Sequence, residues 1–250
     1  MTSKEVNMSQ LATAIMWWLS YTSAVGRNYV LSEGAIKFPA SEYLERSNIL
    51  DIQLEYSHPK LSRKRFDLFF ERKKKEKTVF EFKYIKNGST RTKDEKQRVF
   101  NDLMRLSLFL KEDQNGYFLI CGNQNDFIKD FQKILARPKG ADENIFINPN
   151  QKRDKSTNTK AEGFYTEWFS FDLNDSEKII DLNTSVDDYK KIYNNFITEY
   201  SGSYKSKVGL ELTCPDRLKT NLVFLSGSLE DKPDFSQPSK IGIWKIESYS

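Results

Sequence analysis

The chain has 250 residues, of which 38% are hydrophobic and 30% are charged, so it has enough apolar material for a sizeable core. Its two cysteines have no second Cys or His at a metal-ligand spacing. This excludes a disulfide framework and a cysteine-based zinc site, and we expect a reducing, cytoplasmic environment. No apolar run is long enough to predict a membrane span, and no phosphate-binding Gly-rich loop predicts an ATPase or helicase.

The formal net charge of +4 is unevenly distributed. Residues 60–105 contain 16 Lys and Arg against 7 Asp and Glu, a local charge of +9, so the remainder carries 4 − 9 = −5. Such a block fits a polyanionic partner, and it equally fits a solvated basic face without a partner.

In chain order, the first predicted elements are two helices. Residues 1–31 are expected to form an apolar helix that packs on the core, with Ser9 as its N-cap and Gly26 just past its end. A second helix is expected at residues 32–46, although Pro39 could break it.

Three strands are predicted next, at residues 49–56, 65–70 and 78–85. The first alternates apolar and polar side chains, as a half-buried strand does. The other two are rich in aromatic residues and are joined by the charged turn "ERKKKEK".

A helix is then indicated by the capping box of Thr92 and Glu95, followed by apolar residues at helical spacing. Residues 116–122 are continuously apolar, which is typical of a strand buried on both faces. Another helix is expected through residues 127–135, with Pro138 as its stop.

The second half of the chain is less regular. Residues 138–163 are polar and predict a long loop or insertion. The further elements expected are a helix at residues 189–200 and strands near 164–172, 207–213, 221–226 and 241–247. The order of elements predicts an α/β fold with a central mixed sheet flanked by helices, comprising a core at 32–137 and a C-terminal α+β extension of the same domain at 164–250.

Two charges stand in the middle of the apolar strand at residues 78–85. Because successive side chains of a strand point to opposite faces, Glu81 and Lys83 share one face, and Phe80 and Phe82 share the other. The aromatic face supplies the burial, so we expect the charged face to border a site.

Asp67 is expected to join these charges. In a hairpin centred on Lys74, Asp67 and Glu81 are each seven residues from the centre and lie directly across from each other. Asp67 would share a face with Phe69, whereas Phe66 would lie on the opposite face. A slip of one residue in this register would separate the two carboxylates.

Adjacent carboxylates repel each other, and a divalent cation removes the conflict. Magnesium favours one or two carboxylates, with water and phosphate oxygens completing its shell. Lys83 could hold a phosphate, or orient a metal-bound water and help deprotonate it. Asp67, Glu81 and Lys83, with Mg²⁺ or Mn²⁺, therefore suit phosphodiester hydrolysis.

The spacing of Asp67, Glu81 and Lys83 on consecutive strands resembles the PD-(D/E)XK nuclease superfamily, which has the restriction-endonuclease-like fold. The family core of helix, three strands, helix and strand matches the order of elements at residues 32–122. The resemblance implies that Asp67 and Glu81 bind the metal and that Lys83 assists the attacking water. The proline that often precedes the Asp in this family is Phe66 here.

The bare pattern of carboxylate, any residue and lysine is not specific, because it recurs at residues 71–73, 94–96, 188–190 and 230–232. Only the copy at 81–83 lies inside an apolar strand with an Asp on the preceding strand. The alternative for this copy is an edge strand whose charged side chains reach solvent.

The resemblance also implies a glutamate from the first core helix. Glu33 begins that helix and is our first choice, with Glu42 and Glu45 as competitors. Each of these could equally be an ordinary surface or capping carboxylate. Glu55, on the strand before Asp67, could face the metal or the solvent.

On the helix that follows Lys83, Gln97 is a candidate because related nucleases often place a polar residue there. Asp102 and Arg105 lie near the polar side of the same helix, and the alternative for them is a surface ion pair. The only histidine, His58, has no evident partner and is expected to be structural.

A basic turn beside the proposed site could contact a nucleic-acid backbone or serve as a solubilising tip; it comprises Lys73, Lys74, Lys75 and Lys77. We expect a metal-dependent nuclease that acts on DNA rather than RNA, without membrane association. It would act alone, as a homodimer, or as a subunit of a larger defence or repair complex. The alternative is a non-catalytic protein on the same fold that binds nucleic acid or another protein.

Overall fold

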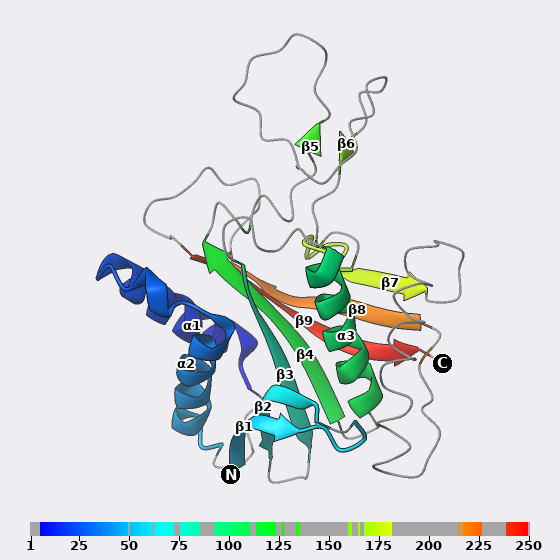
Figure 1. The fold of residues 1–250 in the computed structure, drawn as a ribbon, viewed down its shortest axis with the longest axis horizontal. Helices are drawn as coiled ribbons and strands as arrows, with labels where there is room; N and C mark the ends of the chain where they lie inside the picture. Colours follow the sequence, from blue (N-terminus) through cyan, green and yellow to red (C-terminus); the bar gives the residue numbers. More distant parts are fainter. Residues whose placement is uncertain are drawn as a thin grey trace.

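The computed structural model is an α/β fold in which helices lie against a seven-stranded mixed sheet (Figure 1). The structure describes residues 6–49, 51–61, 63–72, 76–85, 93–110, 114–123, 127, 134–135, 160–161, 165, 168–181, 215, 217–226 and 239–249. The predicted helix at 189–200 and the predicted strand at 207–213 lie outside these ranges, as does most of the polar segment at 138–163.

The first helix, α1, spans Met8–Ala24. The side chain of Asn7 caps it by accepting a hydrogen bond from the Gln10 N–H at 3.1 Å, so the predicted cap at Ser9 is wrong by two residues. Asn and Ser are equally good N-caps, and the apolar pattern alone does not choose between them. Gly26 lies just past the end of α1 with φ +73°, as predicted for a residue that must adopt a left-handed conformation.

A short 3₁₀ turn, η1 (Asn28–Val30), leads to α2, which spans Glu33–Arg46 and confirms the second predicted helix. The Ser32 Oγ caps α2 by accepting a hydrogen bond from the Ala35 N–H at 3.3 Å. Pro39 lies inside α2 and does not end it. The two helices pack against each other on one side of the sheet (Figure 1).

The three strands predicted next are confirmed as an antiparallel meander of β1 (Asp51–Ser57), β2 (Arg65–Glu71) and β3 (Lys77–Ile85). The helix α3 (Lys93–Phe109) then crosses the sheet, and β4 (Gln114–Asn123) returns parallel to β3. Parallel strands need such a crossover, and α3 packs on β3, β4 and β9.

The later strands extend the same sheet. They are β7 (Glu177–Asp181), β8 (Arg217–Leu225) and β9 (Ser239–Tyr249), and β9 pairs antiparallel with β4. The order across the sheet is β1-β2-β3-β4-β9-β8-β7. The strands β8 and β9 confirm the predictions at 221–226 and 241–247, whereas β7 was not predicted.

Two predictions in this half are wrong. Phe127 is helical, as expected, but the predicted helix does not extend to Leu135, because β5 (Ile134–Leu135) pairs with β6 (Lys160–Ala161) in a separate two-stranded sheet. The expected strand near 164–172 is contradicted because Tyr165 lies in a 3₁₀ turn and residues 168–172 are irregular. Short apolar runs fit helix and strand alike, and buried aromatic residues also occur in loops that cover a core.

Two apolar cores lie on the two faces of the sheet. Val79 and Phe118 belong to the core beneath α3, whereas Phe80 and Phe82 belong to the core beneath α1 and α2. The predicted alternation of β3 is therefore confirmed. Among the helices that the structure describes, none is long and apolar enough to cross a membrane.

Candidate active site

The central feature of the site is a gap in the sheet pairing at Asp67. Every other residue of β2 pairs with β1, but Asp67 has no ladder partner there. On the other side, the ladder between β2 and β3 stops at Leu68 and Phe80, one pair short of Asp67 and Glu81. Its register is the one predicted for a hairpin centred on Lys74, so Asp67 and Glu81 are next in line across the two strands.

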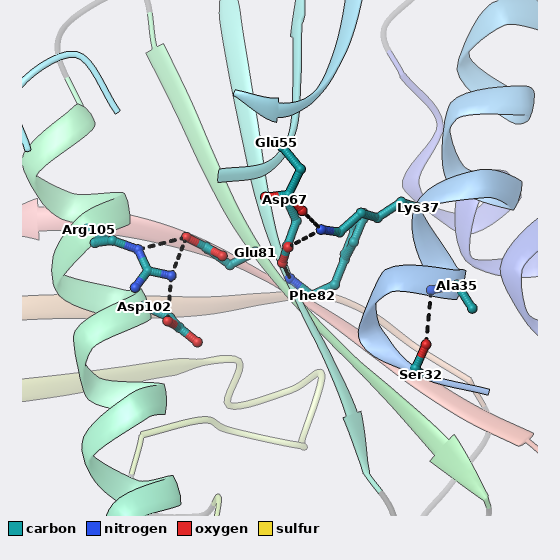
Figure 2. Close-up of polar contacts among 9 residues, drawn as sticks. All are labelled: Ser32, Ala35, Lys37, Glu55, Asp67, Glu81, Phe82, Asp102 and Arg105. Atoms are coloured by element: carbon teal, nitrogen blue, oxygen red, sulfur yellow. Dashed lines mark hydrogen bonds and ion pairs between the residues drawn. The ribbon is translucent and has the colours of Figure 1, made fainter. Parts of the chain in front are cut away.

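The carboxylate of Asp67 fills this gap. Its Oδ2 accepts a hydrogen bond from the Phe82 backbone N–H at 2.7 Å, in place of a bond from strand to strand (Figure 2). Asp67 is thereby held against β3, one residue from Glu81.

The gap on the β1 side has a backbone cause at Glu55. This residue has φ +55°, in the left-handed region, where an L side chain costs about 1–2 kcal/mol. The distortion also disturbs β2, because Phe66 joins Phe69 in the core beneath α3 while Leu68 lies in the opposite core. The prediction that Phe66 lies opposite Phe69 is therefore wrong, since strict alternation fails where a ladder is interrupted.

One side of the site, which we call the α2 half, consists of Lys37, Glu55 and Asp67. The Lys37 Nζ lies 2.8 Å from Asp67 Oδ1 and also contacts Glu55 Oε1, so one ammonium serves two carboxylates (Figure 2). Burial alone would lower the pKa of Lys37, but its hydrogen bonds and charge interactions with Asp67 and Glu55 outweigh burial and raise the pKa.

The other side, the α3 half, consists of Glu81, Asp102 and Arg105. The Arg105 Nε and Nη2 donate to Glu81 Oε1 at 3.1 and 2.9 Å, and Nη2 also lies 2.6 Å from Asp102 Oδ1 (Figure 2). The alternative of a surface pair between Asp102 and Arg105 is thus wrong. The pair exists, but each side chain is only 15% exposed and the arginine is shared with Glu81.

Burial perturbs both carboxylates of the α3 half. It raises the pKa of Glu81 well above its ordinary value, against the opposing charge of Arg105, and the charges of Asp102 and Asp67 raise it further. Burial also raises the pKa of Asp102 to about 6, although the charges of Arg105 and Lys83 oppose this.

Lys83 connects the site to the start of α2. It is buried on β3, two residues after Glu81, and its Nζ lies 2.8 Å from Glu33 Oε1. Glu33 is the first residue of α2, directly after the capping Ser32, which fixes its position over the strand. Of the three candidate glutamates, the structure brings only Glu33 to Lys83. Glu42 pairs instead with Arg46 at the surface, and Glu45 is exposed.

The side chains described so far carry more negative than positive charge. We call them the charged cluster: Glu33, Lys37, Glu55, Asp67, Glu81, Lys83, Asp102 and Arg105. Five carboxylates face three cations, a formal charge of 3 − 5 = −2 with all groups ionised. Repulsion within such a cluster favours the uptake of protons or of a divalent cation.

The remaining candidates lie apart from the charged cluster or outside the described residues. Gln97 donates to Asn101 Oδ1 at 3.0 Å on its own helix, and no described contact links it to the carboxylates. Lys77 is partly exposed, and its Nζ lies 4.0 Å from Glu71 Oε2. Lys73, Lys74 and Lys75 lie outside the described residues.

His58 is buried, as expected of a structural residue, and it contacts the backbone of α3 at Arg105. Its Nδ1 accepts hydrogen bonds from the Lys60 and Leu61 N–H groups, so its Nε2 is the donor to the Arg105 carbonyl oxygen at 3.1 Å. These hydrogen bonds link the loop between β1 and β2 to α3 at Arg105, the residue that binds Glu81.

Sequence reasoning missed Lys37 altogether. Lys37 lies one helical turn after Glu33, a spacing that places both side chains on one face of α2. Because the sequence favours Glu33 as the helix residue of the site, this spacing is also a signal for Lys37. The sharing of Arg105 by two carboxylates has no comparable signal in the sequence, because it depends on how α3 packs against the sheet.

The charged cluster suits a hard divalent cation by its chemistry. Among the described residues, no group of three or more His, Cys, Asp or Glu side chains converges as a metal site. Magnesium, however, needs only one or two protein carboxylates, and both Asp67 and Glu81 offer oxygen ligands. The contacts of Glu81 within the described part of the chain all reach Oε1, which leaves Oε2 for a further ligand.

Comparison of the chain with protein-family models, with curated proteins and with solved structures gave no significant match.

Proposed function

We propose that the chain is a metal-dependent nuclease of the PD-(D/E)XK type, built on a restriction-endonuclease-like core. The observation that carries the proposal is the register of β2 and β3, which sets Asp67 beside the segment from Glu81 to Lys83 at a gap in the sheet. The contact of Glu33 with Lys83 and the excess negative charge of the cluster support it further.

In this proposal Asp67 and Glu81 hold the divalent cation, Mg²⁺ or Mn²⁺. The bound cation would lower the pKa of a water molecule and offset charge on the phosphate. Lys83 orients the attacking water and contacts a phosphate oxygen, and Glu33 keeps the Lys83 ammonium in place. The expected substrate is DNA, with RNA as the less favoured choice.

The experiment is phosphodiester cleavage with Mg²⁺ or Mn²⁺, assayed on duplex DNA, single-stranded DNA and RNA. Glu81→Gln and Lys83→Met should each reduce cleavage by at least about 100-fold, the range found when a group that stabilises the transition state is removed. Glu42→Gln, which alters an exposed carboxylate on α2, is the matched control and should keep full activity. Cleavage that survives both site changes would exclude the proposed chemistry.

A second candidate function is a non-catalytic binding protein on the same fold. The observation in its favour is that Lys37 and Arg105 already neutralise the two proposed metal ligands. The two candidates differ in metal binding: calorimetry with Mn²⁺ should show binding that is lost in Asp67→Asn and Glu81→Gln. Absence of such binding would favour the second function.

A further inference from the structure

The two halves of the charged cluster share one arrangement. In the α2 half, Lys37 lies between a proposed metal ligand, Asp67, and a second carboxylate, Glu55. In the α3 half, Arg105 lies between the other proposed ligand, Glu81, and a second carboxylate. That carboxylate is Asp102. Each proposed ligand is therefore paired with a cation that has another anionic partner within reach.

We infer that Glu55 and Asp102 are positioning residues that retain Lys37 and Arg105 when a metal ion takes Asp67 and Glu81. This inference rests on the proposed function, because it assigns a metal to those two carboxylates. It explains why three cations and five carboxylates are gathered where two carboxylates and a lysine would suffice for the chemistry.

The physical reason is the cost of an unpaired charge in a poorly solvated place. A metal ion that binds Asp67 and Glu81 displaces their present partners, and a displaced buried cation is strongly unfavourable unless another anion holds it. Arg105 Nη2 contacts Glu81 and Asp102 at the same time, at 2.9 and 2.6 Å, so it can release one without leaving the other. The Lys37 ammonium has the same choice between Asp67 and Glu55.

The geometry of Glu81 also allows a stepwise exchange. Both Arg105 donors reach Oε1, and no described residue donates to Oε2. A metal ion can therefore approach Oε2 while Arg105 still contacts Oε1. The Glu81 carboxylate then has a cationic partner throughout the exchange.

The test measures Mn²⁺ affinity by calorimetry and by electron paramagnetic resonance, without any cleavage assay. Arg105→Gln should tighten Mn²⁺ binding, because a competitor is removed, and Asp102→Asn should weaken it by about tenfold. Loss of charge alone would change Mn²⁺ affinity in the same two directions. The double variant, Arg105→Gln with Asp102→Asn, distinguishes this explanation from a role of Asp102 through Arg105. If Asp102 acts through Arg105, Asp102→Asn should change affinity by less than about twofold in the Arg105→Gln background.

Lys37→Gln, Glu55→Gln and their combination form a second double-mutant cycle in the more exposed α2 half. The same non-additive change in Mn²⁺ affinity is expected there. This cycle keeps the inference testable if an α3-half variant does not fold. Glu42→Gln and Arg46→Gln, which alter an exposed pair on α2, are the matched control and should leave Mn²⁺ affinity unchanged.

Additive effects in both cycles, with Mn²⁺ binding intact and dependent on Asp67 and Glu81, would overturn the retention role and leave the proposed function standing. A wild-type chain that shows no such binding would overturn both.

Discussion

The α2 half and the α3 half of the charged cluster contain the same groups, one cation between two carboxylates, in different surroundings. In the α2 half the side chains of Glu55 and Asp67 are 50% and 20% exposed, whereas in the α3 half those of Glu81 and Asp102 are 4% and 15% exposed. Water can replace a lost partner at Glu55 but hardly at Glu81. Burial, and not composition, should therefore decide how much each ion pair contributes to stability.

The largest difference between the halves is expected on removal of the cation. Arg105→Ala removes the cation beside the buried Glu81 and the partly buried Asp102, and it should lower the free energy of unfolding at pH 7 by about 3 kcal/mol. Lys37→Ala should cost only about 1 kcal/mol, because Glu55 can be solvated. Urea denaturation of both variants measures the difference, with the exposed Arg46→Ala as a control that should change stability by less than about 0.5 kcal/mol. Equal losses in the two halves would contradict the role of burial.

A smaller effect is expected in the α3 half when the pH rises from acid to neutral. Because burial raises the pKa of Asp102 to about 6 in the folded chain, the folded state holds a proton that the unfolded chain has released above its ordinary pKa. This contribution to stability is fully present below about pH 4 and is lost as the pH rises through about 6. The charged groups that act on Asp102 include Arg105, Lys83, Asp67 and Glu33, and Asp102 also interacts with the charge of Glu81.

Between pH 4 and pH 7 the wild-type chain should therefore lose about 2 kcal/mol of stability relative to Asp102→Asn. Denaturation at a series of pH values measures this loss. Glu42→Gln, an exposed change, should keep the wild-type slope. A wild-type slope in Asp102→Asn would show that another group is responsible.

The smallest effect concerns the backbone of the α2 half. Glu55→Ala and Glu55→Gly both remove the contact with Lys37, but only glycine adopts φ +55° without strain. Glu55→Gly should therefore be more stable than Glu55→Ala by about 1 kcal/mol. At an ordinary strand position the order of the two variants is reversed, so thermal denaturation of this pair tests whether the left-handed conformation persists in solution.

The parts of the site that lie on one hairpin could be predicted from the sequence. The distance of Asp67 and Glu81 from Lys74 sets the register, and the observed ladder has that register. The alternation of Phe80, Glu81 and Phe82 could also be predicted, because it is a local property of an extended chain.

The parts that depend on packing between distant elements could not be predicted. The left-handed Glu55 has no sequence signal, because glutamate has no preference for that conformation. Arg105 reaches Glu81 because α3 packs against β3, β4 and β9, and three-residue spacing on a helix is equally typical of a surface pair. The strand β7 was missed because its short segment lacks the aromatic residues that identified β2 and β3.

The hydrogen bond from Phe82 N–H to Asp67 gives the molecule a built-in spectroscopic reporter. A backbone amide that donates to a carboxylate has a proton resonance sensitive to the charge and contacts of that carboxylate. Addition of Mg²⁺ should therefore shift the Phe82 amide signal. The amide of Phe80, in the intact ladder opposite Leu68, should hardly move. One pair of nuclear magnetic resonance signals on a single strand would then follow occupancy of the site directly, before any substrate is known.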